Sequence, residues 1–198
     1  MGASCAWAAH DDSGSILSGA WPRNKECASI FEALAAAFPD APVAALDRFA
    51  RARPTDPAAA VAMYHEHARW RSAEGAPERL AAAFAAIPAR WIDGHHRDGD
   101  SDGDADRDRV GVARDGTPLI VVQGARFDGA VSFEQYTLAI CFVLERALAL
   151  GEPGKVTVLL DVRAGAGWPN PPARALVPFF RHANRVLAAH YPEVHCVE

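Results

Sequence analysis

The segment TPLIVVQGARFDGAVSFEQYTLAICFVLERALALGEPGKVTVLLDV, residues 117–162, holds two strand patterns with one long helix pattern between them. TPLIVVQG (117–124) and KVTVLLDV (155–162) are short apolar runs rich in β-branched residues. The second run does not alternate polar with apolar side chains, which predicts a strand covered on both faces. Ser132 is a candidate N-cap for the intervening helix, and Gly151 is a candidate terminator. A strand, a helix and a strand of these lengths predict a crossover between parallel strands.

The segments on either side extend this pattern. RVGVA (109–113) precedes the first strand, and the Asp115-Gly116 pair between them is a signal for a hairpin turn. PPARALVPFFRHANRVLAAH (171–190) predicts a helix, and VHCV (194–197) predicts the start of another strand. The expected apolar side of that helix is formed by Leu176, Phe180, Ala183, Leu187 and Tyr191.

Residues 25–92 predict a small helical unit, and residues 1–24, which lack periodicity, predict a disordered tail. Three apolar stripes have helical spacing: Ile30, Leu34 and Phe38; Val43, Leu46, Phe49 and Ala50; and Met63, Tyr64, His67 and Trp70. Arg48 and Arg51 fall outside the second stripe and are expected on the surface. PERLAAAFAAI (77–87) predicts a fourth helix. The chain is thus expected to be α/β, with an N-terminal helical unit followed by a mostly parallel sheet with flanking helices.

The limits of the early helices follow from proline and capping residues. Pro39 and Pro54 end the first two helices. Thr55 or Asp56 can cap the third helix, with Pro57 in its first turn.

HHRDGDSDGDADRDR, residues 95–109, is rich in aspartate. DGDSDG (98–103) matches the first half of an EF-hand calcium loop. Arg109 stands where that loop needs a bidentate glutamate, so a calcium site is not expected. Like charges in series repel, and Asp and Gly avoid regular structure. Residues 93–109 are therefore expected to form an acidic connector between the helical unit and a sheet domain at 110–198.

The composition limits the class of protein and of partner. A chain of 198 residues, 50% of them hydrophobic, can bury one substantial core. A formal net charge of -5 and a pI near 5.9 argue against a nucleic-acid partner. The four cysteines lack paired spacing, which fits a reducing compartment, and no run reaches the roughly 18 apolar residues of a membrane span. A cytoplasmic protein is expected.

Signals for catalysis, metals and cofactors are weak. His65, Glu66 and His67 point in different directions from a helix and cannot converge on one metal. Asp161 ends a strand pattern before RAGAG (163–167), at the place where open α/β sheets hold ligands, but the third glycine of a dinucleotide fingerprint is missing. We therefore expect no enzyme activity, no cofactor and no metal, and keep a hydrolase that uses Asp161 and nearby histidines as an alternative.

Four stretches follow one another in a recognisable order. RFARARPTDPAAAVAMYHEHARWR (48–71) contains an Arg-Ala-Arg triplet and closes on a Trp-Arg pair, and ARDGTPLIVVQGARFD (113–128) holds an Asp-Gly turn before an apolar strand. KVTVLLDV (155–162) is an apolar strand ending in Asp, and HYPEVHCV (190–197) is a Tyr-Pro-Glu turn before a further strand. Together they resemble the CRAL-TRIO family of lipid-binding and phosphatidylinositol-transfer proteins, over residues 28–198.

The resemblance implies a non-catalytic domain that binds a phospholipid, a phosphoinositide or another small hydrophobic ligand and transfers it between membranes. In phosphoinositide-binding relatives, the last Arg of the triplet and the Glu of Tyr-Pro-Glu help hold the headgroup, which carries over to Arg53 and Glu193. A guanidinium suits a phosphate, and a carboxylate can accept hydrogen bonds from inositol hydroxyls. Alternatively, Arg53 caps the end of its helix and Glu193 faces solvent. The implied partners are the lipid and a transient membrane surface, with which the protein would be peripherally associated.

The chain departs from the family pattern at two places. Pro54-Thr55 replaces the family's Lys-Phe. The family's further sheet, lid helix and headgroup lysine would follow residue 198, so residues 110–198 are expected to be a partial domain, truncated at its C-terminus. An alternative is a protein-interaction or regulatory module that keeps a partial fold without a functional pocket, with a protein partner covering its exposed sheet edge.

Overall fold

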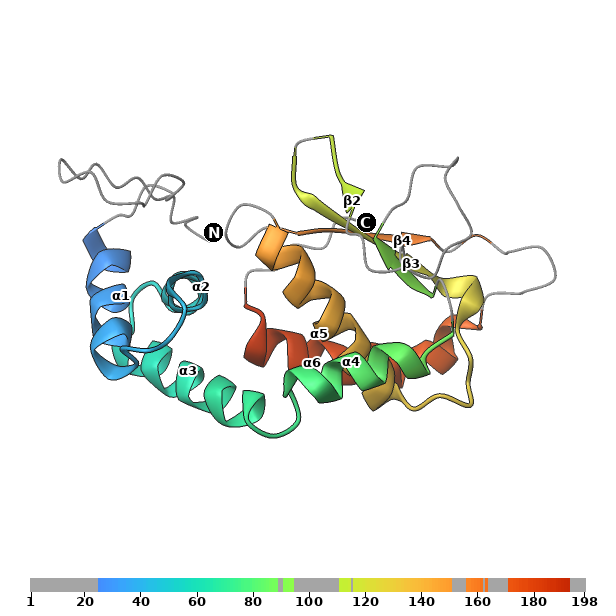
Figure 1. Ribbon diagram of the computed structural model, residues 1–198, viewed down its shortest axis with the longest axis horizontal. Helices are drawn as coiled ribbons and strands as arrows, with labels where there is room; N and C mark the ends of the chain where they lie inside the picture. Colours follow the sequence, from blue (N-terminus) through green and yellow to red (C-terminus); the bar gives the residue numbers. More distant parts are fainter. Residues whose placement is uncertain are drawn as a thin grey trace. The chain divides into compact units, whose positions relative to one another are not determined.

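The structure, a computed structural model, describes residues 25–88, 91–94, 111–114, 116–150, 156–161, 163 and 171–192. The predicted tail, Glu193 and the predicted strand at 194–197 lie outside the described residues. The described part is mixed α/β and mostly helical. Its elements (Figure 1) are α1 (Lys25–Ala37), α2 (Val43–Ala52), α3 (Pro57–Arg71), α4 (Pro77–Ala86), β1 (Ile92–Gly94), β2 (Gly111–Val112), β3 (Pro118–Gln123), the 3-10 helix η2 (Gly124–Arg126), α5 (Phe133–Leu150), β4 (Thr157–Asp161) and α6 (Ala173–His190).

The chain divides into two compact units. The first is formed by the described residues up to Arg69 together with those from Ala189 onward. The second is formed by the described residues from Trp70 to Ala188. The boundary therefore lies earlier in the chain than the predicted end of the helical unit at residue 92.

In the first unit, α1, α2 and α3 pack through the stripes that helical spacing predicts. The buried members of this core are Ile30, Leu34, Ala45, Leu46, Phe49, Ala50, Ala60 and Tyr64. Phe38 packs against the core, with its ring centroid 4.6 Å from that of Tyr64. Burial raises the pKa of Tyr64. Val43 was also expected in this core, but it is 49% exposed, since it is the first residue of α2 and precedes the buried turn.

An ion pair is buried within α2. Arg51 Nη2 lies 3.1 Å from Asp47 Oδ2, one helical turn earlier, and the two side chains are only 9% and 8% exposed. The prediction that Arg51 lies on the surface is therefore wrong. An isolated buried charge is costly, and its pairing with Asp47 offsets that cost.

Two helix starts have the predicted caps. Asp56 Oδ1 accepts a hydrogen bond from the backbone N–H of Ala59 at 2.9 Å, with Pro57 in the first turn of α3. Ser132 Oγ accepts one from the backbone N–H of Gln135 at 3.1 Å, and Gln135 Oε1 accepts one in return from the Ser132 N–H at 3.3 Å. This reciprocal arrangement is a capping box, which satisfies two backbone donors at the start of α5.

β3 is the central strand of the sheet in the second unit. β4 pairs with it in parallel, from Leu119–Thr157 to Gln123–Asp161, as predicted. β2 pairs with it antiparallel through the predicted hairpin, in which Gly116 has a φ of 87°, a conformation that glycine adopts without steric cost. β1 is also antiparallel to β3, so the described part of the sheet is less parallel than predicted.

The register of β1 and β2 shows that the two ends of the acidic stretch lie next to each other on β3. Gly94 pairs with Ile120, and Gly111 pairs with the next residue of β3, Leu119. Gly94 and Gly111 are thus successive positions on one edge of β3, although 16 residues lie between them in the sequence. Asp93 and Gly94, which the sequence placed in the acidic connector, are therefore strand residues, and residues 95–110, which lie outside the described residues, join two neighbouring positions on one edge of β3. The sequence did not predict β1, because a strand of three residues is too short to show the alternation of polar and apolar side chains.

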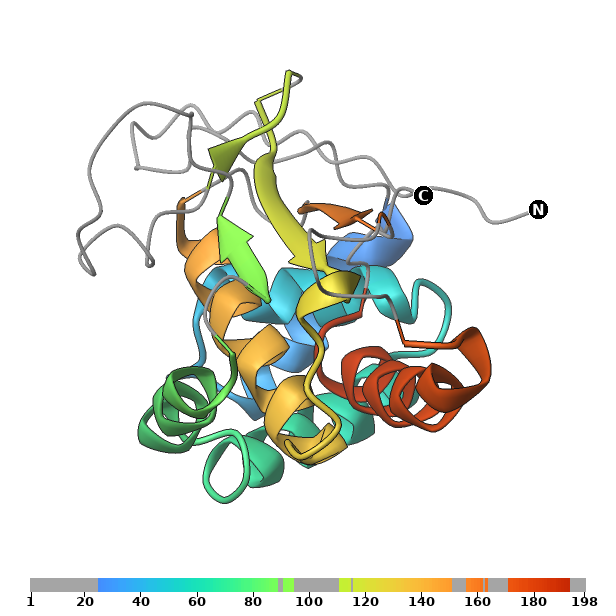
Figure 2. The ribbon, with the colours of Figure 1, turned by 90° about the vertical axis from the view of Figure 1, so that its right-hand side faces the viewer.

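α5 packs against the sheet, through β1 and β3, and α4 packs along α5 (Figure 2). The buried side of α4 is formed by Leu80, Ala83 and the following Ile87. Phe84 stacks on Phe142 of α5, with ring centroids 4.9 Å apart. α4 therefore belongs with the sheet, whereas the sequence placed it in the N-terminal helical unit. Its apolar side needs a partner helix, and α5 supplies it.

Aromatic rings fill the space between the sheet, α5 and α6. The members of this cluster are Trp91, Phe127, Phe133, Tyr136 and Phe179. The ring centroids of Trp91 and Tyr136 lie 4.3 Å apart, and Phe179 lies 6.0 Å from Trp91. Phe179 is 5% exposed, whereas Phe180, the predicted core residue, is 41% exposed. Successive helix residues point about 100° apart, and the aromatic cluster decides which of the two faces inward.

The Tyr136 hydroxyl forms two hydrogen bonds with the backbone of the segment that follows η2. It accepts a hydrogen bond from the backbone N–H of Asp128 at 2.7 Å and donates one to the Asp128 carbonyl at 3.2 Å. Burial is the main cause that raises the pKa of this hydroxyl.

Candidate functional site

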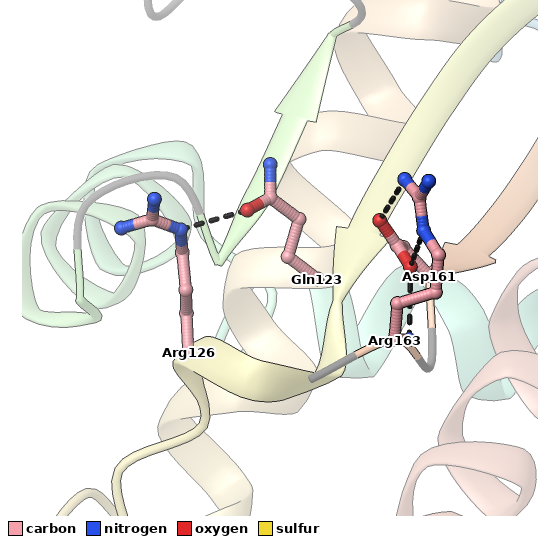
Figure 3. Close-up of polar contacts among 4 residues, drawn as sticks. All are labelled: Gln123, Arg126, Asp161 and Arg163. Atoms are coloured by element: carbon pink, nitrogen blue, oxygen red, sulfur yellow. Dashed lines mark hydrogen bonds and ion pairs between the residues drawn. The ribbon is translucent and has the colours of Figure 1, made fainter. Parts of the chain in front are cut away.

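Four polar side chains stand at the carboxyl ends of the parallel strands β3 and β4 (Figure 3). Gln123 and Asp161 are the last residues of these strands and are paired in register. Arg126 ends η2, directly after β3, and Arg163 follows β4. In open α/β sheets, ligands bind outside this end of the strands.

Arg163 holds Asp161 through three hydrogen bonds. Its Nε and backbone N–H donate to Asp161 Oδ1 at 2.9 and 3.0 Å, and its Nη2 donates to Oδ2 at 2.8 Å. The side-chain bonds first, and then the backbone bond, lower the pKa of Asp161 from 3.8 to about 2. A carboxyl with this pKa is ionised at neutral pH, whereas a general acid needs a pKa near the working pH. Asp161 is therefore suited to orient Arg163 and unsuited to proton transfer.

Arg126 is held by a neutral partner. Its Nε donates to Gln123 Oε1 at 2.7 Å, and its two Nη groups have no partner among the residues that the structure describes. Asp128, two residues later, directs its carboxylate to the backbone N–H of Ala130 at 2.8 Å. The half-buried Arg126 guanidinium therefore has no carboxylate partner among the described residues and presents its Nη donors to a ligand, an arrangement that suits a phosphate or a carboxylate.

β4 presents apolar side chains to solvent beside these polar groups. Leu159 is 48% exposed and Leu160 is 43% exposed. Successive strand residues point to opposite faces, so each face of β4 carries one accessible leucine. The prediction that this strand is covered on both faces is therefore wrong for the part of the chain that is described. Ile120 and Val121 in the neighbouring β3 are, by contrast, buried.

The described structure includes only one of the two headgroup residues that the family resemblance implies. Arg53 is exposed at the C-terminal end of α2, where its Nη1 donates to the backbone carbonyl of Ala52 at 3.3 Å. This contact matches the capping alternative. Glu193 lies outside the described residues. A headgroup site at Arg53 and Glu193 stays a prediction.

The Trp-Arg pair that closes α3 has a structural role. The Trp70 ring packs so closely on Gly75 that a Cβ there would collide with it. Arg71 Nη1 donates to the Gly75 carbonyl, and its Nη2 lies 3.1 Å from Glu145 Oε2 of α5. The pair therefore fastens the turn after α3 onto α5.

The histidine-rich part of α3 does not form a metal site. His67 is 6% exposed and packs on Phe49 and His190, with ring centroids 5.1 and 5.7 Å away, whereas His65 and Glu66 are exposed. Within the described ranges, no three His, Cys, Asp or Glu side chains are placed to hold a metal ion. The calcium-like part of the acidic stretch lies outside those ranges.

Sequence reasoning missed Gln123 and Arg126 as candidate ligand residues. The available signal was their place at the end of a strand pattern, where open α/β sheets bind ligands. Arg126 stands within the stretch that resembles the CRAL-TRIO family, but its hydrogen bond to Gln123 becomes visible only in three dimensions.

Comparison with known proteins gives no assignment: no protein family and no curated protein matches the chain. Among the described helices, none combines the length and the apolar character needed to cross a bilayer.

Proposed function

We propose that the chain binds a phospholipid, a phosphoinositide or another small hydrophobic ligand and exchanges it with a membrane surface. The observation that carries this proposal is that β4 exposes one leucine on each of its faces, Leu159 and Leu160, next to the polar strand ends. Covering a half-exposed leucine with an acyl chain would stabilise the complex by about 1 kcal/mol for each side chain. Each further methylene removed from water would add about 0.8 kcal/mol.

The order of elements supports the same proposal. The hairpin, β3, α5, β4 and α6 follow in the order that the four family-like stretches imply, after an N-terminal helical segment. We infer that the second unit is a CRAL-TRIO-like sheet domain that acts in the cytoplasm and peripherally at membranes. The resemblance still implies headgroup contacts for Arg53 and Glu193, and Arg126 is an additional candidate because its Nη donors are uncommitted within the described residues.

Lipid recovery and a binding titration would test the proposal. Organic extraction of the purified protein, followed by mass spectrometry, is expected to yield one class of lipid in stoichiometric amount. A phosphatidylcholine with a fluorescent acyl chain is expected to gain fluorescence on addition of protein. Leu160→Asp should weaken this binding at least tenfold, because it removes apolar contact and sets a charge against the acyl chain. Val112→Asp is the matched control, since Val112 is 68% exposed on β2, across β3 from β4.

Two outcomes would refute the proposal. Protein that is folded, free of extracted lipid and unable to take up the fluorescent lipid would exclude a carrier role. Equal weakening by Leu160→Asp and Val112→Asp would show that β4 is not the ligand-binding surface.

A protein-interaction or regulatory module is the second candidate, and one observation favours it. Among the described residues, β4 pairs only with β3, so its other edge offers backbone donors and acceptors to a partner strand. Light scattering during size-exclusion chromatography would test this. A mass that rises with concentration and returns to the monomer value with Leu159→Lys would support association through β4, and a constant monomer mass would oppose self-association.

A further inference from the structure

α6 is a basic helix in an acidic chain. Its 18 residues contain three arginines, Arg174, Arg181 and Arg185, and no Asp or Glu, whereas the whole chain has a formal net charge of -5. All three side chains are exposed. Arg185 Nη2 lies 3.1 Å from His182 Nδ1, and no acidic side chain in the described ranges pairs with any of the three arginines. Their positive charges are therefore not neutralised within the described structure.

The exposed side of α6 also carries apolar residues. Helix residues three or four positions apart share a side, so Arg174, Val177 and Arg181 follow one another along the helix. Val177 is 44% exposed, and Phe180 is 41% exposed at the margin of the same side. Phe179 is buried in the aromatic cluster on the other side of the helix. One side of α6 thus holds the core, and the other combines cations with accessible apolar groups.

We propose that this side of α6, formed by Arg174, Val177, Phe180, Arg181 and Arg185, docks on the surface of an anionic lipid bilayer. Guanidinium groups bind lipid phosphates and carboxylates, and apolar side chains beside them insert between the headgroups. A nucleic acid would satisfy the arginines through its phosphates but would leave Val177 and Phe180 without an apolar partner. The inference rests on the proposed function, because the membrane is the source and the acceptor of the ligand.

Vesicle flotation would test the docking surface. The full chain is expected to bind vesicles of phosphatidylcholine and phosphatidylserine more tightly than vesicles of phosphatidylcholine alone, and added salt should weaken the binding. Each arginine near an anionic membrane contributes about fivefold, so R174Q/R181Q/R185Q should lower vesicle affinity roughly 100-fold. Gln has nearly the helix propensity of Arg, and circular dichroism would check that α6 is retained.

Two single variants provide a matched comparison. Arg181→Gln is expected to weaken binding about fivefold, whereas Arg114→Gln, an equal loss of charge at an exposed position outside α6, should have less than a twofold effect. Phe180→Ser should weaken binding about fivefold at every salt concentration, because its contribution is apolar.

Three results would overturn the docking surface: unchanged flotation of the triple variant, equal binding to both kinds of vesicle, or tighter binding to a short DNA duplex than to anionic vesicles. Failure of the carrier function is a separate result. Without vesicles, the triple variant should take up the fluorescent lipid as well as the unchanged chain does. If neither protein takes it up while flotation still depends on the arginines, the docking surface stands and the carrier function fails.

Discussion

Removal of residues 95–110 should leave the sheet intact and stabilise the second unit. Because Gly94 pairs with Ile120 and Gly111 pairs with Leu119, a direct Gly94–Gly111 peptide bond would keep every pair between β3 and its antiparallel neighbours. Loop closure costs about 0.6 kcal/mol for each doubling of loop length, so removal of a 16-residue insertion, four doublings, should raise the free energy of unfolding by about 2 kcal/mol.

Urea unfolding followed by circular dichroism would measure this change, and hydrogen exchange would locate it. Amides of β3 should exchange roughly 30-fold more slowly if opening of the sheet limits their exchange. A control variant replaces residues 95–110 with 16 glycines and serines. Its stability should match that of the unchanged chain, because the entropic cost depends on length and not on charge.

A deletion variant that unfolds at lower urea, or that loses exchange protection in β3, would show that Gly94 and Gly111 are not adjacent on the sheet edge. If the glycine-serine variant is less stable than the unchanged chain, the acidic side chains contribute contacts to the fold.

Other predictions concern packing, charge and hydrogen bonding. Gly75→Ala should lower the free energy of unfolding by about 1–3 kcal/mol in urea titrations, because a Cβ collides with an indole ring, while Gly129→Ala, with open space around it, should be nearly neutral. Arg163→Gln should return the pKa of Asp161 from about 2 toward 3.8 in a carboxyl NMR titration. Because its pKa is lowered, the Asp161 carboxylate stabilises the folded state above about pH 4, and this stabilisation is lost as the pH falls toward 2. The free energy of unfolding of Arg163→Gln should therefore lack this pH dependence. An unchanged Asp161 titration in the variant would show that Arg163 is not the cause of the lowered pKa. Tyr136→Phe should destabilise by about 1 kcal/mol in the same urea assay and speed amide exchange after η2, because it removes a hydroxyl that bonds both backbone groups of one residue.

Much of the second unit could be predicted from the sequence because the signals are local. The capping box at Ser132 and the positive φ of Gly116 depend on a few neighbouring residues. The parallel pairing of β3 with β4 follows from two apolar strands joined by one long helix.

The candidate site could be predicted only in part. Asp161 was visible from the sequence as the end of an apolar strand. The roles of Arg126 and Arg163 were not, because the side-chain partners of an arginine depend on rotamers and on the course of the chain after each strand. The inward choice of Phe179 over Phe180 is of the same kind, since both have equal hydrophobicity and only the cluster that receives the ring distinguishes them.

The sequence by itself determined the elements whose patterns extend over several turns or strand residues: the helices, their caps, the hairpin and the parallel strand pair. Only the tertiary structure decided that α4 packs on α5 and that Gly94 and Gly111 meet on β3. The physical reason is that a helical stripe or a three-residue strand specifies a surface to be covered, whereas the partner that covers it is selected by shape and backbone hydrogen bonding between distant segments.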